Sequence, residues 1–259
     1  MMHLSTRPAP ACVLAGALLI SPLVGAAEIE GRLAFADRVV LSTPVGGVIE
    51  EVPVRAGEVV EAGALLVALD DTPFRHRLWR ASAELPGLKR AADEAERDAE
   101  RVQALYDRTS ASDSELEVAR IERDRAAGER DAARAEAGLR GWEKERAALE
   151  APFAARILAV NAAPGEVVSP RLAPPPLVEI ARADRLLATV SVDADALGEL
   201  SLGDELSVSR DGERRSGTVE AISVVDADGG LRYRVAVEID SSGLDWRAGQ
   251  SVSVDLPGA

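Results

Sequence analysis

The chain has 259 residues, of which 47% are hydrophobic and only 3% aromatic, and its formal net charge at pH 7 is −14. So few aromatic residues argue against one bulky core and favour small β modules and slender helices. The acidic balance makes the chain a poor binder of nucleic acid. Residues 74–150 carry about 16 basic and 18 acidic residues, so this centre is charge-balanced while its flanks are acidic. The contrast predicts different kinds of structure in the two parts.

The first 27 residues have the features of a secretion signal. Arg7 gives a weak positive start, residues 9–24 form an apolar run, and the small residues 25–27 suit cleavage. Cys12 lies too early in the run to be a lipidated cysteine, so the mature chain has no disulfide and no thiolate chemistry. The alternative is an uncleaved membrane anchor, although the run is short for a span.

A heptad pattern of apolar residues predicts a long helix over residues 76–106. Its positions are Leu78, Ala81, Leu85, Leu88, Ala92, Ala95, Ala99, Val102 and Tyr106. A second series follows at Val118, Ile121, Arg125, Gly128, Ala132, Ala135, Leu139, Trp142, Arg146 and Leu149. Two series with this spacing are typical of coiled-coil seams. The simplest structure that joins them is an antiparallel helical hairpin about 45–50 Å long.

Local signals place the ends of the two helices. Pro86 predicts a kink or a restart in the first helix, because proline removes a backbone hydrogen bond. The turn is expected at residues 107–111. Ser112 and Glu115 have the spacing of a capping box, which would start the second helix. We expect that helix to end at Glu150.

Two β segments of similar sequence flank the predicted hairpin. Residues 45–70 and 151–168 contain short apolar runs separated by turns at Gly57, Gly63 and Gly165. Both segments contain the sequence Gly-Glu-Val-Val. Two such halves on either side of an insertion predict one small β-sandwich.

This sandwich resembles the lipoyl/biotinyl fold. Split by a helical hairpin, it resembles the membrane fusion proteins, the HlyD-like periplasmic adaptors of efflux pumps, from about Leu33 to the C-terminus. Ala155 departs from the family, which often has glycine at that point. The alternative is a true lipoyl or biotin carrier, which needs a lysine on a β-turn between its halves. The chain has only Lys89 and Lys144, and both lie in predicted helices.

Several short strands with glycine turns near the C-terminus predict a small antiparallel β-barrel. The expected elements are strands at 177–180, 187–192, 206–208, 217–225, 233–239 and 251–254, a short helix at 193–200 and a turn at 228–230. Residues 28–40 would add a strand before the chain enters the sandwich, as in the family. Family members often carry a further membrane-proximal domain, which we expect to be absent or reduced because the chain stops at Ala259.

The predicted fold is therefore α+β and elongated, with a helical hairpin inserted in a lipoyl-like sandwich and a barrel beside it. The expected divisions are a signal peptide at 1–27, a barrel from 28–44 and 172–259, a sandwich from 45–73 and 151–171, and a hairpin at 74–150. No catalytic constellation is visible. His76 stands alone after the signal, so we expect no metal, no cofactor and no enzymatic activity.

The tip of the hairpin carries the candidate site. Arg101, Leu105 and Ser112 stand in the order R-x3-L-x6-S. This order resembles the motif by which adaptors of resistance-nodulation-division (RND) pumps meet a TolC-type outer-membrane channel. The resemblance implies that Leu105 fills an apolar contact and that Arg101 bonds channel carbonyls or carboxylates. The alternative is structural, with Ser112 capping a helix and Arg101 an ordinary solvated charge.

The resemblance implies an adaptor that works in the periplasm by assembly. Subunits would form a homo-oligomeric ring, six in the family, whose hairpins build a tube. The ring would bridge an inner-membrane transporter and the outer-membrane channel. Two alternatives remain: an adaptor of an ABC exporter or type I secretion system, which usually keeps an N-terminal anchor, and the carrier domain.

Overall fold

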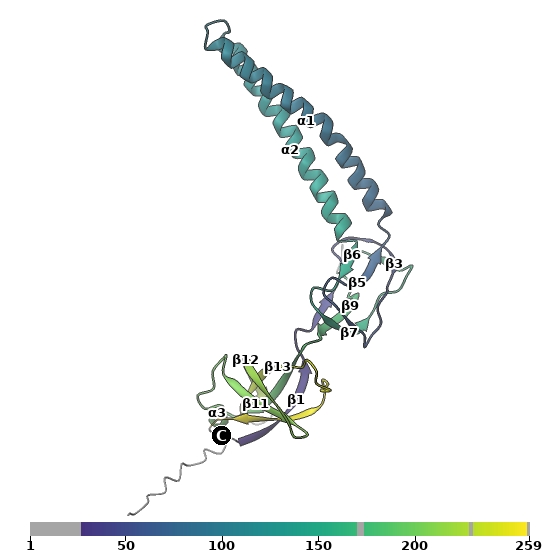
Figure 1. The fold of residues 1–259 in the computed structure, drawn as a ribbon, viewed down its shortest axis with the longest axis vertical. Helices are drawn as coiled ribbons and strands as arrows, with labels where there is room; N and C mark the ends of the chain where they lie inside the picture. The colour runs from purple at the N-terminus through teal and green to yellow at the C-terminus, as the bar shows by residue number, and fades with distance from the viewer. Residues whose placement is uncertain (1–26, 170–173, 228–229, 258–259) are drawn as a thin grey trace, which may run out of the picture.

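A computed structural model describes residues 27–169, 174–227 and 230–257. The predicted signal peptide, up to residue 26, and turn residues 228–229 lie outside this description. The described chain forms a β-barrel, a β-sandwich and a long two-helix arm, arranged one after another along an elongated molecule (Figure 1).

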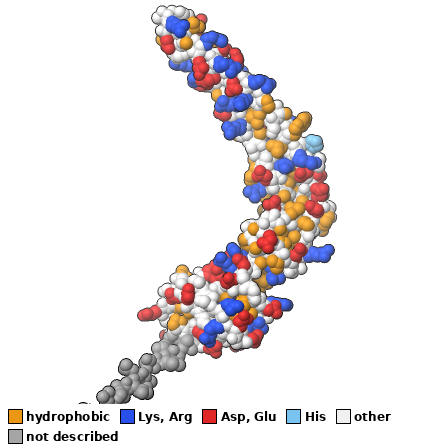
Figure 2. Space-filling model, in the orientation of Figure 1, with side chains coloured by type: hydrophobic (Ala, Val, Ile, Leu, Met, Phe, Trp, Pro, Cys, Tyr) orange, Lys and Arg blue, Asp and Glu red, His pale blue; other side chains and the backbone are white. Residues whose placement is uncertain are grey.

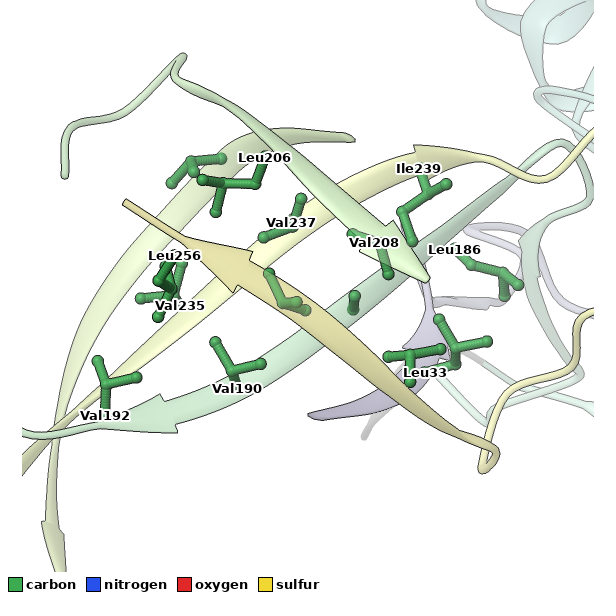
Figure 3. Packing of buried hydrophobic residues seen from close by; sticks show 14 of the residues in the cluster. Leu33, Leu186, Val190, Val192, Leu206, Val208, Val235, Val237, Ile239 and Leu256 are labelled. Atoms are coloured by element: carbon green, nitrogen blue, oxygen red, sulfur yellow. The ribbon is translucent and has the colours of Figure 1, made fainter. Parts of the chain in front are cut away.

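Six antiparallel strands close into the barrel, in the order β1-β10-β13-β12-β11-β14. The elements are β1 Ala27–Phe35, β10 Arg185–Val192, α3 Ala194–Leu197, β11 Glu205–Arg210, β12 Glu213–Ala227, β13 Gly230–Asp240 and β14 Ser251–Leu256. Alternate residues point inward, so Val190, Val208 and Val237 meet in the interior (Figure 3). The predicted barrel is present, and its core is mainly aliphatic.

The sandwich has two four-stranded sheets, in the orders β2-β9-β7-β4 and β6-β5-β3-β8. Its strands are β2 Val39–Leu41, β3 Gly47–Glu51, β4 Val59–Val60, β5 Leu65–Leu69, β6 Ala148–Glu150, β7 Ala155–Val160, β8 Val167–Val168 and β9 Val178–Arg182. Ile49 and Leu66 from before the arm share one hydrophobic core with Ile157 and Ile180 from after it. The two segments therefore make one body, as the sequence predicts.

The two halves of the sandwich repeat one another. Strands β2 to β5 correspond in order to β6 to β9, and the neighbours in the two sheets match strand for strand. The Gly57 N–H donates to the Ile157 carbonyl at 2.8 Å, and the Gly165 N–H donates to the Ile49 carbonyl at 2.8 Å. Each Gly-Glu-Val-Val turn thus pairs with the central strand of the other half. Ala155 begins β7 and is fully buried, so its departure from glycine leaves the strand intact.

Three predicted boundaries are wrong. Strands β2 and β9 belong to the sandwich and not to the barrel, because β9 pairs with β2 and β7. The second helix ends at Glu145, and residues 148–150 form β6, which pairs with β5. Apolar alternation in such short segments fits any half-buried strand. Only the pairing partner decides which body a short strand joins.

Two long helices form the arm: α1 Thr72–Tyr106 and α2 Asp113–Glu145, which lie side by side and run in opposite directions (Figure 1). Helix α1 continues through Pro86, so the predicted restart is wrong. Pro86 is exposed, which lets water bond the carbonyl that the proline leaves without a donor. Among the described residues, no helix combines the length and apolarity that a membrane crossing requires.

The contact face of α1 is the predicted one. Every predicted position from Leu78 to Val102 is buried or half-buried, and Ala92 and Ala99 have only 4% and 5% of their surface exposed. Tyr106 is the exception, because it lies at the exposed end of the helix. Small residues in the middle of this face allow α2 to approach closely.

The contact face predicted for α2 is wrong. Its large side chains are exposed, from 42% for Trp142 to 64% for Val118. We name the outward series Val118, Ile121, Arg125, Gly128, Ala132, Ala135, Leu139 and Trp142 the outer stripe. Helix α2 instead turns Leu116, Ala126 and Ala137 inward, towards α1.

The inward face of α2 contains arginines, so its residues do not form an apolar repeat that the sequence would reveal. Arg123, Arg130 and Arg140 share the inward face and are half-buried. Long arginine stems cover apolar surface while the guanidinium reaches water and pairs there. Arg123 pairs with Asp124 at 2.8 Å, for example. Charges of both signs consequently alternate along the surface of the arm (Figure 2).

Candidate functional site: the tip of the two-helix arm

The arm ends in a short, tightly bonded loop at residues 107–112. The Ser110 N–H donates to the Leu105 carbonyl at 2.9 Å, and the Thr109 N–H donates to the Tyr106 carbonyl at 2.8 Å. Thr109 has a φ of +58°, a left-handed conformation that reverses the chain within a few residues. The loop therefore presents the end of α1 and the start of α2 in a defined arrangement.

Ser112 caps α2 through the predicted capping box. Its Oγ accepts from the Glu115 N–H at 3.3 Å, while the Glu115 carboxylate accepts from the Ser112 N–H at 2.8 Å. These bonds favour the charged carboxylate, so the Ser112 backbone N–H and then its hydroxyl lower the pKa of Glu115. The side chain of Ser112 is thus engaged by its own helix.

Arg101 and Leu105 both face solvent near the tip. The Arg101 guanidinium pairs with Asp98 at 2.5 Å, and 66% of the arginine side chain is exposed. An ion pair this exposed contributes at most about 1 kcal/mol, so Arg101 is free to change partners. Leu105 keeps 42% of its surface in water. The structure brings both residues to one end of the arm, with Ser112 across the loop.

Polar bonds between the helices hold the tip in register. The Arg120 guanidinium donates to Gln103 Oε1 at 2.8 Å, and Gln103 Nε2 donates to Asp107 at 2.9 Å. The Asp113 carboxylate beside Tyr106 favours the protonated phenol and so raises its pKa. The tip is therefore already built in the isolated chain.

A groove of about 500 Å³ lies between the helices just below the tip. Val102 and Leu105 of α1 and Val118 of α2 contribute apolar side chains to it, and Arg101 contributes a positive charge. Val118 was assigned to the helix–helix seam by its heptad spacing, so its place at this groove was missed. Spacing identifies the residues of one helix face but not the direction in which that face points.

The predicted turn glycines lie in the sandwich and are remote from the tip in sequence. Gly57, Gly63 and Gly165 have φ values of +89°, +80° and +87°. Only glycine adopts this region without strain, so these residues shape the sandwich. Lys89 and Lys144, the chain's only lysines, lie in α1 and α2. A lipoyl or biotin carrier would need a lysine on a β-turn instead.

No protein-family model matches the chain. Its fold is similar to that of the membrane fusion protein Spr0693 from Streptococcus pneumoniae R6, with a TM-score of 0.63 at 18% identity, over 90% of this chain and 99% of that one. A MacA–MexA chimera that contains the Pseudomonas aeruginosa MexA α-hairpin domain gives 0.61 at 13% identity, over 90% and 79%.

MacA from Actinobacillus actinomycetemcomitans gives a TM-score of 0.52 at 16% identity, over 89% of this chain and 78% of that one. Identities this low establish a shared fold and not shared partners. The structural likeness nevertheless extends over about 90% of this chain. The protein has the fold of the membrane fusion proteins, the periplasmic adaptors of efflux systems.

Proposed function

We propose that the protein is a periplasmic adaptor of a tripartite efflux system. It would join an inner-membrane transporter, of the RND type, to a TolC-type outer-membrane channel. The observation that carries the proposal is the split sandwich with a long arm, whose tip is held in a defined conformation by its own hydrogen bonds. Such an arm has no catalytic purpose but reaches about 50 Å from its base, at 1.5 Å per helical residue.

The adaptor acts by assembly and not by catalysis. Several copies would stand in a ring, six by analogy with the family, with the arms forming a tube. The barrel end would contact the transporter, which supplies the energy, and the substrate would pass through the ring.

Two features of the tip support contact with a channel. Leu105 offers an exposed apolar side chain at the end of the arm, and Arg101 offers a charge held only by an exposed ion pair. Leu105 would fill an apolar contact, and Arg101 would exchange Asp98 for carbonyls or carboxylates of the channel. Ser112 would keep the loop in shape through its cap on α2.

A photo-crosslinking residue in place of Leu105 tests this proposal in the native cell. The expected product joins the protein to an outer-membrane channel, and the same substitution at Ala91, an exposed position in the middle of α1, should not give it. Leu105→Asp should abolish export of the system's substrate, whereas Ala91→Asp should not. Wild-type export by Leu105→Asp, or equal crosslinks at both positions, would reject the tip contact.

The same cells distinguish an RND partner from an ABC exporter or a type I secretion system. Crosslinking from the exposed Leu202 in the barrel, followed by mass spectrometry, should capture the transporter. If the captured transporter has an ATP-binding domain, the protein would instead be the adaptor of an ABC exporter or of a type I secretion system.

A further inference from the structure

A cavity of about 540 Å³ lies where the barrel joins the sandwich. Residues 36–38 and 183–184 are the two connections between these bodies in the described chain (Figure 1). Strands β7 and β9 of the sandwich supply one wall of the cavity. The end of β1, the start of β10 and the loop after β13 supply the other wall, from the barrel. The volume lies in the range of sites that bind small molecules.

Backbone hydrogen bonds hold the two walls together. The Ala183 N–H donates to the Ala154 carbonyl at 3.0 Å, which fixes one connection to the sandwich. The Ser241 N–H donates to the Asp184 carbonyl at 2.9 Å, which fixes the same connection to the loop after β13. The chain itself therefore sets the shape of the cavity, as is usual for ligand sites.

Positive charge gathers at this cavity in an otherwise acidic chain. Arg156 of β7, Arg182 of β9 and Arg247 of the loop after β13 line it. Asp245 is the only acidic side chain among its described lining residues. The net charge of the whole chain is −14, so the composition does not explain three arginines around one hollow. A cleft lined by one sign of charge attracts ligands of the opposite sign.

Arg182 is held in place by its own neighbours. Its guanidinium donates to both carboxylate oxygens of Asp184, at 2.9 Å each. The same guanidinium lies 5.4 Å from the centroid of the Phe153 ring. Because Asp184 already balances its charge, Arg182 mainly shapes the wall of the cavity.

Arg156 and Arg247 keep hydrogen-bond donors for a ligand. Arg156 is exposed, donates to the Gly57 carbonyl at 3.2 Å and forms no ion pair within the described residues. Arg247 pairs with Asp245 at 3.3 Å, and the two side chains are 76% and 95% exposed. So exposed an ion pair contributes little and is easily exchanged. Each guanidinium has five N–H donors, which suit an incoming carboxylate.

The barrel adds an apolar surface beside these charges. Phe35 and Leu244 line the cavity, are only partly buried and pack against the barrel core. Leu186 and Trp246 lie behind them, with 5% and 8% of their surface exposed. An apolar group placed in the cavity would extend this core and leave water.

We infer that the cavity binds a small organic anion, with its acidic group among the arginines and its apolar body against Phe35 and Leu244. Arg156 comes from the sandwich and Arg247 from the barrel, so the ligand touches both bodies. The inference does not rest on the proposed function, because it follows from the cavity alone.

Tryptophan fluorescence of the purified protein tests the site. Of the three tryptophans, Trp246 lines the cavity, whereas Trp79 and Trp142 lie exposed on the arm. Trp79→Phe with Trp142→Phe therefore leaves one reporter at the cavity. The probe is octanoate, which combines a carboxylate with an apolar chain. Octanamide removes the charge from this probe, and acetate removes the apolar chain.

Two variants remove the charges that the two bodies contribute. Arg156→Gln and Arg247→Gln should each weaken octanoate binding about tenfold or more, the usual effect of losing a bond to a charged group. Octanamide binding should change little in either variant. Arg232→Gln is the matched control, because Arg232 is exposed in β13 at the end of the barrel away from the cavity. Circular dichroism on each variant verifies that the fold is retained.

The expected result is a saturable fluorescence change with octanoate, at least tenfold tighter than with octanamide or acetate. No saturable change with octanoate would overturn the inference. Equal affinity for octanoate and octanamide would show that the arginines do not bind the acidic group, and equal affinity for acetate would show that the apolar surface is not used. Loss of binding in Arg232→Gln to the same extent as in Arg156→Gln would place the ligand elsewhere. Since the assay uses the purified protein, its outcome is separate from that of the export and crosslinking tests in cells.

Discussion

The three residues of the tip motif have different roles: some stabilise the local structure of the tip, and others are available to contact a partner protein. Ser112 and Glu115 satisfy each other's backbone groups, which is why their spacing could be recognised without a structure. Leu105 has no such local task, and its exposure at the end of the arm is the reason to assign it a partner. Arg101 lies between these cases, because its bond to Asp98 is local but exposed.

Removing the cap hydroxyl by Ser112→Ala should destabilise the start of α2 by about 1 kcal/mol, the usual effect of losing an N-cap. Amide hydrogen exchange in the first turn of α2 should become faster than in the wild type. Ser114→Ala is the matched control, because Ser114 lies inside the helix and does not cap it. Equal exchange in the two variants would contradict the assigned cap.

The cap should also depend on pH in a defined direction. The bonds from Ser112 lower the pKa of Glu115 in the folded arm, so their contribution to stability is complete above the pKa of the unfolded chain. It is lost as the pH falls through the folded pKa. NMR titration of the Glu115 carboxyl should give a low midpoint that rises in Ser112→Ala.

At the scale of the element, α2 shows that heptad spacing alone does not choose the contact face. Its two opposite faces both repeat every three and four residues, and the more apolar one points outward. The inward face contains Ala126 and Ala137 with arginines between them. Alanine permits a close approach of α1, and the arginine stems lie along the interface, so this face packs although its composition is less hydrophobic.

Overpacking distinguishes the two faces of α2. Ala126→Leu inserts a large side chain between the helices and should cost about 1–3 kcal/mol. Ala132→Leu, the matched change on the outer stripe, should leave the free energy of unfolding of the single chain nearly unchanged. Urea denaturation at low protein concentration measures both. A larger loss for Ala132→Leu would show that the face assignment is reversed.

At the scale of the whole molecule, the arm is an insertion whose two ends meet. The Leu69 N–H donates to the Ala147 carbonyl at 2.9 Å, which joins the strand before α1 to the residue after α2. The sandwich core draws its buried residues from both sides of this junction. The barrel is likewise completed by β1 from before the sandwich and five strands from after it.

The arm should therefore be removable. Replacing residues 75–145 by a short glycine-serine linker should leave the barrel and the sandwich folded, because the strands and their core residues, Phe74 included, are retained. Two-dimensional NMR should show dispersed β-sheet signals and loss of the helical ones. Collapse of the β signals would show that the arm is required for the sandwich to fold. The shortened chain should fail in export even when it folds.

The sequence by itself determined the order of the bodies, the turn glycines, the capping box and the length of the arm, because each depends on local chemistry or on a period along the chain. The tertiary structure alone decided which face of α2 meets α1, since two faces share the same spacing. It also decided that β2, β6 and β9 belong to the sandwich. A short strand buries one side wherever it pairs, and the pairing partner lies far away in the sequence.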